Sequence, residues 1–283
     1  LIIARMPSRS SSASIPEISM FSSFRMPMLS DTRMSSSSLK SCMRFRDESQ
    51  ISYTNLTFES GKTYALLGAS GCGKSTLLSL ISGLIKPERG LIKINGRSLR
   101  ESAANIGYML QHDHLFPWCS VWDNVLLGLK IQHACTPEKE ERLRSLLEQY
   151  GLADFIHSNP KHLSGGMRQR VALIRTLALE PELLLLDEPF SALDYQTRIS
   201  VSDDIAGIIR KQGKTAILVT HDISEAISLA DRVIILSRRP GSIKKTLDIS
   251  LSCQSDRVID KRQAPEFSKY FNEIWKELNS DAA

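Results

Sequence analysis

The sequence lacks any long apolar run. No stretch of its 283 residues approaches the ~20 consecutive apolar residues that a transmembrane helix requires. The longest apolar runs, such as residues 183–186 and 216–219, have the length of buried strands. If the protein works at a membrane, it therefore reaches the membrane through a partner chain.

Disulfide and metal patterns are also missing from the sequence. The five cysteines are odd in number and scattered, and no two of them form a C-x-x-C pair. Apart from His221, the histidines show no metal-ligand spacing. We therefore expect reduced thiols, as in a cytosolic protein, and no structural zinc site.

An excess of positive charge is missing outside the N-terminal segment. The formal net charge is +5, but the first 46 residues hold seven Lys and Arg against two acidic residues. The remaining residues are nearly neutral, which argues against a nucleic-acid-binding surface. The hydrophobic fraction of 42% and the charged fraction of 24% are ordinary for a globular chain.

Residues 1–38 show neither helical nor strand periodicity. They are rich in Ser, Met and Arg and include the serine runs 10–12 and 35–38. A targeting peptide, a functional tail and an overextended gene start all fit this composition. We expect a disordered or non-native extension.

Residues 39–245 have the pattern of one α/β domain, because continuous apolar strands alternate with helical segments. We expect a mainly parallel sheet with helices on both faces, an antiparallel β subdomain near its start and an α-helical subdomain at about residues 112–163. A short helical extension is expected at residues 246–283. The expected strands are 39–45, 51–58, 64–67, 91–94, 106–110, 183–186, 215–220 and 232–236, and the expected helices are 75–82, 121–129, 137–150, 165–179, 196–211, 223–229 and 265–278.

A phosphate-binding loop is the clearest motif. Residues 68–75 read G-x-x-x-x-G-K-S between an apolar strand and a helix. The glycines let backbone N–H groups converge at a helix N-terminus, where an anion is favoured. Lys74 adds a positive charge for the β- and γ-phosphates, and Ser75 offers a hydroxyl to Mg²⁺. The alternative is a glycine-rich turn that happens to carry a lysine, which the flanking strand and helix make the weaker interpretation.

A second motif is the pair Asp187 and Glu188 at the end of the apolar strand 183–186. Ligands of open α/β sheets bind at such strand ends. Asp187 is suited to hold Mg²⁺ through water, and Glu188 to orient or deprotonate an attacking water. Alone, the pattern also fits a strand that enters a solvated loop. Its place after a phosphate loop and before Pro189 favours the functional interpretation.

The octet Leu163–Arg170, LSGGMRQR, predicts a second anion site. Ser164, Gly165 and Gly166 stand at a helix start, where a hydroxyl and free N–H groups favour an anion. An ordinary glycine-rich N-cap explains Ser-Gly-Gly alone but not the whole octet. One chain then has two such helix ends and one lysine-bearing loop, so the second end is expected to serve the nucleotide of another copy.

Together these motifs resemble the ATPase subunit of an ABC transporter over about residues 39–240. Walker A is Gly68–Thr76, the glutamine loop is at Gln111, the signature is Leu163–Gln169, and Walker B is Leu183–Asp187 followed by Glu188. The D-loop is Ser191–Asp194 and the switch histidine is His221. The resemblance implies a P-loop NTPase fold and a head-to-tail homodimer that holds two MgATP.

The resemblance also implies roles for individual residues. Glu188, His221, Gln111 and Lys74 would be catalytic, and Ser75, Gln111 and Asp187 would face the metal. An aromatic residue would stack on adenine, with Phe45 the best match and Tyr53 the runner-up. The nucleotide-binding residues would be Phe45, Gly68, Ala69, Ser70, Gly71, Cys72, Gly73, Lys74, Ser75, Thr76, Ser164, Gly165, Gly166, Gln169 and Asp194.

A finer resemblance is to the nitrate/sulfonate/taurine importer branch, through residues 115–118, 123–125, 219–226 and 239–241. It implies integral-membrane permease subunits, indirectly a substrate-binding protein, and a peripheral place on the cytoplasmic face of the cell membrane. Residues 116–118 also fit simple core packing.

The alternatives are an ATPase of another importer or exporter, or a non-transport ABC ATPase. Chromosome-maintenance ATPases need a long coiled-coil insertion for which the interval from Lys74 to Ser164 is too short, and translation ATPases usually carry two cassettes. A catalytically dead scaffold is disfavoured because Lys74, Asp187, Glu188 and His221 are all present.

Overall fold

The computed structural model describes residues 40–47, 51–99, 106–253 and 255–280, all within the unit Ser37–Ala283. For residues 40–47 and 51–54 we describe the backbone only. The predicted N-terminal extension therefore lies outside the described residues. So do the side chains of Phe45 and Tyr53, the candidates for adenine stacking.

A six-stranded sheet in the described residues carries the site, with the order β10-β9-β3-β8-β7-β6. Its parallel strands pair as β9-β3, β3-β8, β8-β7 and β7-β6, and β10 is antiparallel to β9 at the edge. The bounds are β3 Thr63–Leu67, β6 Ile106–Met109, β7 Leu183–Asp187, β8 Thr215–Val219, β9 Arg232–Leu236 and β10 Ile243–Asp248. The predicted α/β fold with a mainly parallel sheet is confirmed.

Both faces of this sheet are covered, which explains why its strands β3, β7 and β8 are buried along their whole length. Leu184 and Leu186 pack into a cluster with α3, α5 and α6, whereas Leu183 and Leu185 pack on the opposite face with α1 and the second sheet. A third cluster joins β3 and β9 to α7 and α9 through residues such as Ile274. Because side chains alternate between the faces, each strand supplies two cores at once.

The second sheet is antiparallel, with the order β2-β1-β4-β5. Its strands are β1 Lys40–Asp47, β2 Ile51–Glu59, β4 Arg89–Ile94 and β5 Arg97–Ser98. Asn95 and Gly96 join β4 to β5 with φ angles of 54° and 76°. A hairpin turn of this kind needs positive φ at both central residues, so the Asn-Gly hairpin signal is confirmed.

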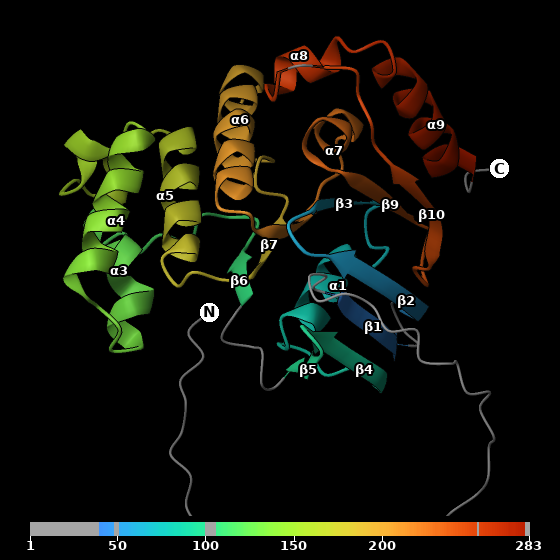
Figure 1. Cartoon of the computed structure of the whole chain (residues 1–283), viewed down its shortest axis with the longest axis horizontal. Helices are drawn as coiled ribbons and strands as arrows, with labels where there is room; N and C mark the ends of the chain where they lie inside the picture. The colour runs from blue at the N-terminus through green and yellow to red at the C-terminus, as the bar shows by residue number, and fades with distance from the viewer. Residues whose placement is uncertain (1–39, 48–50, 100–105, 254, 281–283) are drawn as a thin grey trace, which may run out of the picture. The chain divides into compact units, whose positions relative to one another are not determined.

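Helices α3 to α6 pack on one face of the large sheet with α7 to α9 further along it (Figure 1), and α1 packs on the opposite face. Their bounds are α1 Lys74–Ile81, α3 Val121–Ile131, α4 Pro137–Gln149, α5 Gly165–Leu177, α6 Tyr195–Lys211, α7 Ile223–Leu229, α8 Val258–Arg262 and α9 Phe267–Asn279, with single 3₁₀ turns at Ala153–Phe155 and Pro160–His162. Thr136 caps α4 by accepting a bond from the Lys139 N–H, with Pro137 in the first turn, as predicted.

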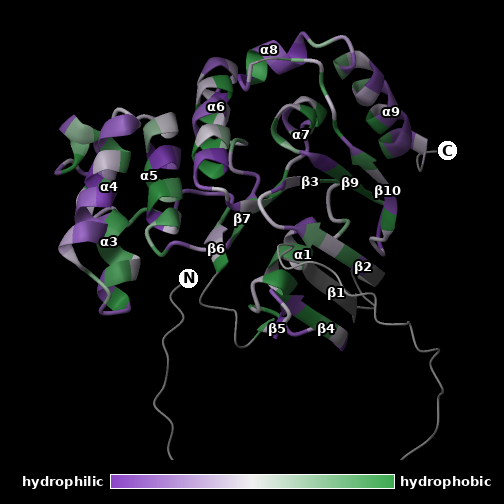
Figure 2. Cartoon of the chain, in the orientation of Figure 1, coloured by the Kyte–Doolittle hydropathy of each residue, from purple (hydrophilic) through white to green (hydrophobic). Residues whose placement is uncertain are grey.

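The helices carry hydrophilic and hydrophobic residues on the same element, as Figure 2 shows for α4, α6 and α9. Within the described part of the chain, no helix combines the length and the apolar character needed to cross a bilayer. Two elements depart from the expectations. Strand β10 and helix α8 were not predicted, because β10 is a half-exposed edge strand that contains two lysines and α8 has only five residues.

Candidate nucleotide-binding and hydrolysis site

The loop between β3 and α1 has the shape that its glycines allow. Gly71 and Gly73 have φ angles of 75° and 103°, in the left-handed region that favours glycine. Gly73 caps α1 and, being glycine, has no side chain that could bond the first N–H groups of that helix. A Cβ at Gly68 would lie 2.7 Å from the Cys72 Sγ and 3.2 Å from the Leu236 carbonyl oxygen. A tightly folded loop thus precedes the first turn of α1 and is suited to an anion.

Lys74 folds back over this loop. Its Nζ donates to the carbonyl oxygens of Gly68 at 2.8 Å and Ala69 at 3.0 Å, and the residue is buried. An ammonium group has three N–H donors. Two of them hold the loop, and within the described residues the third is left for a ligand in the loop.

Ser75 and Asp187 meet at the end of the sheet. The Ser75 Oγ donates to the Asp187 Oδ1 at 3.2 Å, and the Tyr108 hydroxyl donates to the Asp187 Oδ2 at 3.4 Å. Burial raises the pKa of Asp187 above its usual range. Burial also raises the pKa of Tyr108 to about 12, with the Asp187 charge as the second cause. Asp187 is therefore a buried carboxylate for which a nearby cation would be a favourable partner.

The residues around Asp187 suit Mg²⁺ by their chemistry. The Ser75 hydroxyl and the Asp187 carboxylate are hard oxygen ligands of the kind that this ion prefers, and the Gln111 amide contacts the adjacent Glu188. Within the described residues, no three His, Cys, Asp or Glu side chains cluster as a self-sufficient metal cage. Mg²⁺ commonly binds through one or two protein groups and completes its shell with phosphate oxygens and water. The donor set fits that second mode.

Glu188 is held in an unusual backbone conformation. It follows the last residue of β7 with a φ angle of 46°, and its N–H donates to the Val219 carbonyl on β8 at 2.9 Å. A left-handed backbone is unfavourable for a residue with a Cβ. The conformation gives the two adjacent carboxylates different partners, since Asp187 contacts Ser75 while Glu188 does not.

Two predicted catalytic side chains converge on one carboxylate oxygen of a third. The Gln111 Nε2 donates to the Glu188 Oε2 at 3.2 Å. The His221 Nδ1 lies 3.5 Å from that same oxygen. Gln111 follows β6, Glu188 follows β7 and His221 follows β8, so three neighbouring parallel strands end at one place. The arrangement can fix a carboxylate between an amide and an imidazole at the carboxyl edge of the sheet.

The octet lies on another part of the fold. Ser164 caps α5 by accepting a bond from the Met167 N–H at 3.3 Å. A Cβ at Gly166 would meet the Thr197 Cγ2 at 2.6 Å, and one at Gly165 would meet the Leu193 Cδ2 at 3.2 Å. In the described residues these glycines therefore face α6 and the turn before it. Gln169 is buried, and its Oε1 has no hydrogen-bond partner among the described residues.

Asp194 has a structural task at the start of α6. Its carboxylate accepts the Thr197 N–H at 3.1 Å, and the hydrogen bonds from Thr197 lower the pKa of this exposed group. Ser191, at the start of the same turn, donates from its hydroxyl to the Glu188 carbonyl at 3.0 Å. The turn Ser191–Asp194 is thus attached to Glu188 at one end and to α6 at the other.

Sequence reasoning missed several residues that shape this region. Tyr108 contacts Asp187, and no spacing rule singles it out. Asn124, fully buried on α3, accepts the Phe116 N–H at 2.7 Å and donates to the Ser120 carbonyl at 2.9 Å. It fixes the loop that follows Gln111. The Arg168 Nε of the octet donates to the Asp113 Oδ2 in this loop at 3.0 Å.

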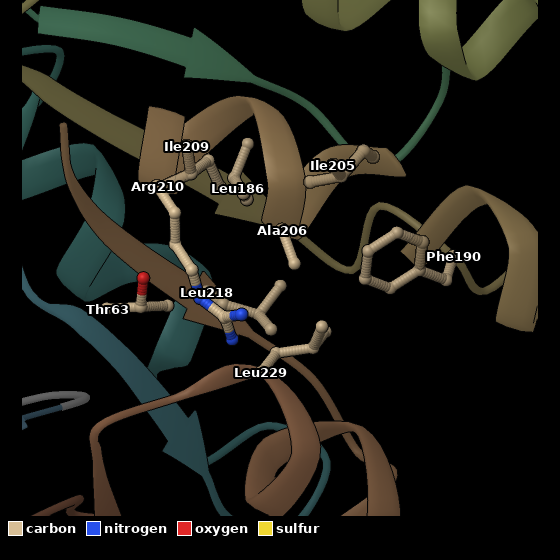
Figure 3. A pocket seen from close by; sticks show the side chains of 9 residues that line it. All are labelled: Thr63, Leu186, Phe190, Ile205, Ala206, Ile209, Arg210, Leu218 and Leu229. Carbon is tan, nitrogen blue, oxygen red and sulfur yellow. The ribbon is translucent and has the colours of Figure 1, made fainter. Parts of the chain in front are cut away.

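An apolar pocket lies beneath α6 (Figure 3). Its lining combines apolar side chains with Thr63 and Arg210 at one side. Thr63 donates its N–H to Asp231, and Arg210 pairs with Asp256. The pocket lies inside the helix–sheet core, and Leu186 is the one residue of its lining that belongs to a motif, Walker B. Its lining residues are Thr63, Leu186, Phe190, Ile205, Ala206, Ile209, Arg210, Leu218 and Leu229.

Comparison with known proteins shows the family. The ABC transporter family model matches residues 51–191. An uncharacterised ABC transporter ATP-binding protein, YtlC of Bacillus subtilis, is 51% identical over 222 residues, which cover 78% of this chain and 85% of that protein. The chain belongs to the ATP-binding proteins of ABC transporters. The predicted motifs are thus those of a family that binds ATP and couples its hydrolysis to transport.

Further relatives place this ABC ATPase in the predicted branch. The nitrate import ATP-binding protein of Synechocystis is 42% identical over 224 residues, covering 78% of this chain and 84% of that protein. The taurine import ATP-binding protein of Rhizobium johnstonii is 41% identical over 217 residues, covering 76% and 83%. The dimeric ADP- and phosphate-bound ATP-binding cassette MJ0796 is similar in structure, with a TM-score of 0.62 and 28% identity over 75% of this chain and 98% of that one.

Proposed function

We propose that this ABC ATPase energises an importer by hydrolysing MgATP in a head-to-tail homodimer. The convergence of Gln111 and His221 on the Glu188 carboxylate, beside the Ser75–Asp187 pair, is the observation that carries the proposal. Similarity to a dimeric cassette with bound ADP and phosphate supports the dimer. In this assembly the octet of one copy faces the phosphate loop of the other.

The chain's own residues divide the work at each site. The N–H groups at the start of α1 and the Lys74 Nζ bind the phosphates. Ser75 and Asp187 would hold Mg²⁺, which would neutralise phosphate charge. Glu188 orients the attacking water and accepts its proton, Gln111 holds the Glu188 carboxylate in place, and His221 stabilises charge at the γ-phosphate.

The importer role rests on the relatives. Proteins named for the import of nitrate, aliphatic sulfonates and taurine are 39–42% identical to this chain. We infer a solute that carries an oxyanion group, integral-membrane permease subunits and a substrate-binding protein. The ATPase itself would be peripheral, on the cytoplasmic face of the membrane.

Trapping the dimer tests the proposal. Glu188→Gln keeps the shape of the side chain but cannot accept the proton, so this variant should bind MgATP without cleaving it. We expect it to run as a dimer in gel filtration with excess MgATP and as a monomer without nucleotide. A variant that stays monomeric with MgATP would contradict the shared-site arrangement.

Lys74→Ala tests the role of Lys74 in ATP binding. Because Lys74 is the one side-chain cation that bonds the loop in the described residues, its loss should abolish measurable ATP binding in a fluorescent-nucleotide titration. Lys139→Ala, in the first turn of α4, is the matched control and should bind ATP as the wild type does. Unchanged affinity in Lys74→Ala would refute the role given to this lysine.

A further inference from the structure

Arg198 connects two turns that sequence analysis treats as separate motifs. It lies one turn into α6, after the N-cap Asp194. Its NH2 group donates to the Leu193 carbonyl at 3.1 Å, within the turn Ser191–Asp194. On its other side, NH1 lies 3.8 Å from the Asp222 carboxylate and Nε lies 3.7 Å from the Glu225 carboxylate. One guanidinium therefore bridges the turn before α6 and the start of α7.

The start of α7 holds His221 between two hydrogen-bonded residues. The Thr220 hydroxyl donates to the Glu225 Oε2 at 2.6 Å and accepts the Asp222 N–H at 3.0 Å. The Asp222 carboxylate in turn accepts the N–H groups of Ser224 and Glu225. His221 lies between Thr220 and Asp222, so its backbone position follows from this small network.

The network is poorly suited to a purely stabilising role. Glu225 is 4% exposed, and its pKa is raised by burial. The Arg198 Nε is buried without a hydrogen-bond partner among the described residues. A buried carboxylate at such a distance from a partly buried guanidinium gains little against its loss of hydration, and apolar side chains of similar volume would serve stability as well. Groups of this kind tend to be kept at sites where function requires them.

We propose that Arg198 is a positioning residue that ties the turn Ser191–Asp194 to the His221 turn of the same chain. Through the Leu193 carbonyl and Glu225, the position of one turn sets the position of the other. The distance of His221 from Glu188 then depends on α6. This inference rests on the proposed function, since it concerns the hydrolysis step that Glu188 and His221 perform.

The test compares turnover with nucleotide affinity. Arg198→Gln removes the charge that bridges the two turns but leaves the phosphate loop intact. We expect its kcat for ATP hydrolysis to fall by about ten- to a hundredfold, as for other small misplacements of catalytic groups. The Kd for MgATP should stay within about twofold, since no binding residue is changed. A merely structural defect would lower the affinity and the melting temperature together.

A second variant makes the test independent of folding. Glu225→Gln keeps the side-chain volume and can still bond Thr220, but it removes the charge that faces Arg198. It should reduce kcat by a similar factor, and the double variant should lose no more than either single one, because both break the same link. Arg210→Gln is the matched control, since Arg210 pairs with Asp256 near the far end of α6. It should leave kcat unchanged.

Different outcomes contradict different claims. Wild-type turnover in Arg198→Gln, or a double variant that shows the product of the two single effects, would overturn the link. If Arg198→Gln does not fold, an undiminished kcat in Glu225→Gln overturns it equally. Hydrolysis that survives Glu188→Gln would instead refute the proposed function. Hydrolysis that needs Glu188 but neither Arg198 nor Glu225 would refute the positioning role alone.

Discussion

Gly166→Ala is expected to destabilise the protein, because α5 and α6 approach too closely at this point for a side chain. The added Cβ would lie 2.6 Å from the Thr197 Cγ2 and 3.1 Å from the Val201 Cγ2. Both neighbours are β-branched and stiff, so relief requires a shift of the helices. Overpacking of this kind costs about 2–3 kcal/mol.

Part of that cost is offset, because replacing glycine by alanine inside a helix gains about 1 kcal/mol. The net loss is therefore about 1–2 kcal/mol, and for a domain of this size the melting temperature should fall by about 2–8 °C. Gly207→Ala in α6 is the matched control, since a Cβ there meets nothing within 4 Å. It should raise the melting temperature by about 2–4 °C.

Thermal unfolding followed by circular dichroism, without nucleotide, measures both variants. Thr197→Ser removes the methyl group that clashes and keeps the hydroxyl, so the double variant with Gly166→Ala should recover most of the lost stability. An increase in melting temperature for Gly166→Ala equal to that of Gly207→Ala would refute the close approach of the two helices. So would the absence of any rescue by Thr197→Ser.

Three further substitutions test the environments of Asp187, Asn124 and Gly68. Asp187→Asn should be more stable than the wild type at pH 7, and this advantage should be smaller near pH 4. Folding raises the pKa of Asp187 above 3.8, so the contribution of Asp187 to the free energy of unfolding falls as pH rises from about that value. Thermal melts without nucleotide at both pH values check this, and an equal difference in melting temperature at the two pH values would contradict it. Asn124→Leu should lower the free energy of unfolding by at least about 2 kcal/mol, because it leaves buried backbone groups unpaired. The control Asn279→Leu, at an exposed position of α9, should lower it little, and urea unfolding measures both variants. Gly68→Ala should bind ATP at least about tenfold more weakly in a fluorescence titration, because its Cβ would clash with the Cys72 Sγ and press on the Leu236 carbonyl. Wild-type affinity in this variant would contradict the tight packing of the loop.

Local signals predicted much of the fold. The Thr136–Pro137 start of α4, the Asn95–Gly96 hairpin and the apolar strand β7 each depend on neighbouring residues, and the structure has all three. Strand β10 and helix α8 depend on partners distant in sequence. β10 exists through its pairing with β9, and α8 is fixed through the contact of the Val258 N–H with Asp203. No local pattern carries that information.

The same distinction holds for the site. The phosphate loop and the pair Asp187–Glu188 are contiguous in sequence and could be found there. The contact of Glu188 with Gln111 and His221 needs the strand order, which places β6, β7 and β8 side by side. Tyr108 contacts Asp187, which lies 79 positions away in the sequence, and Arg198 contacts Glu225, which lies 27 positions away. Sequence spacing says nothing about such pairs.

The left-handed backbone of Glu188 has an evolutionary consequence. A residue with a Cβ in this region costs of order 1–3 kcal/mol relative to a relaxed conformation, and glycine would avoid most of that cost. Mutation followed by selection for heat resistance alone should therefore drive position 188 toward glycine and yield a hardier protein that no longer cleaves ATP. Retaining glutamate there requires continued selection for turnover.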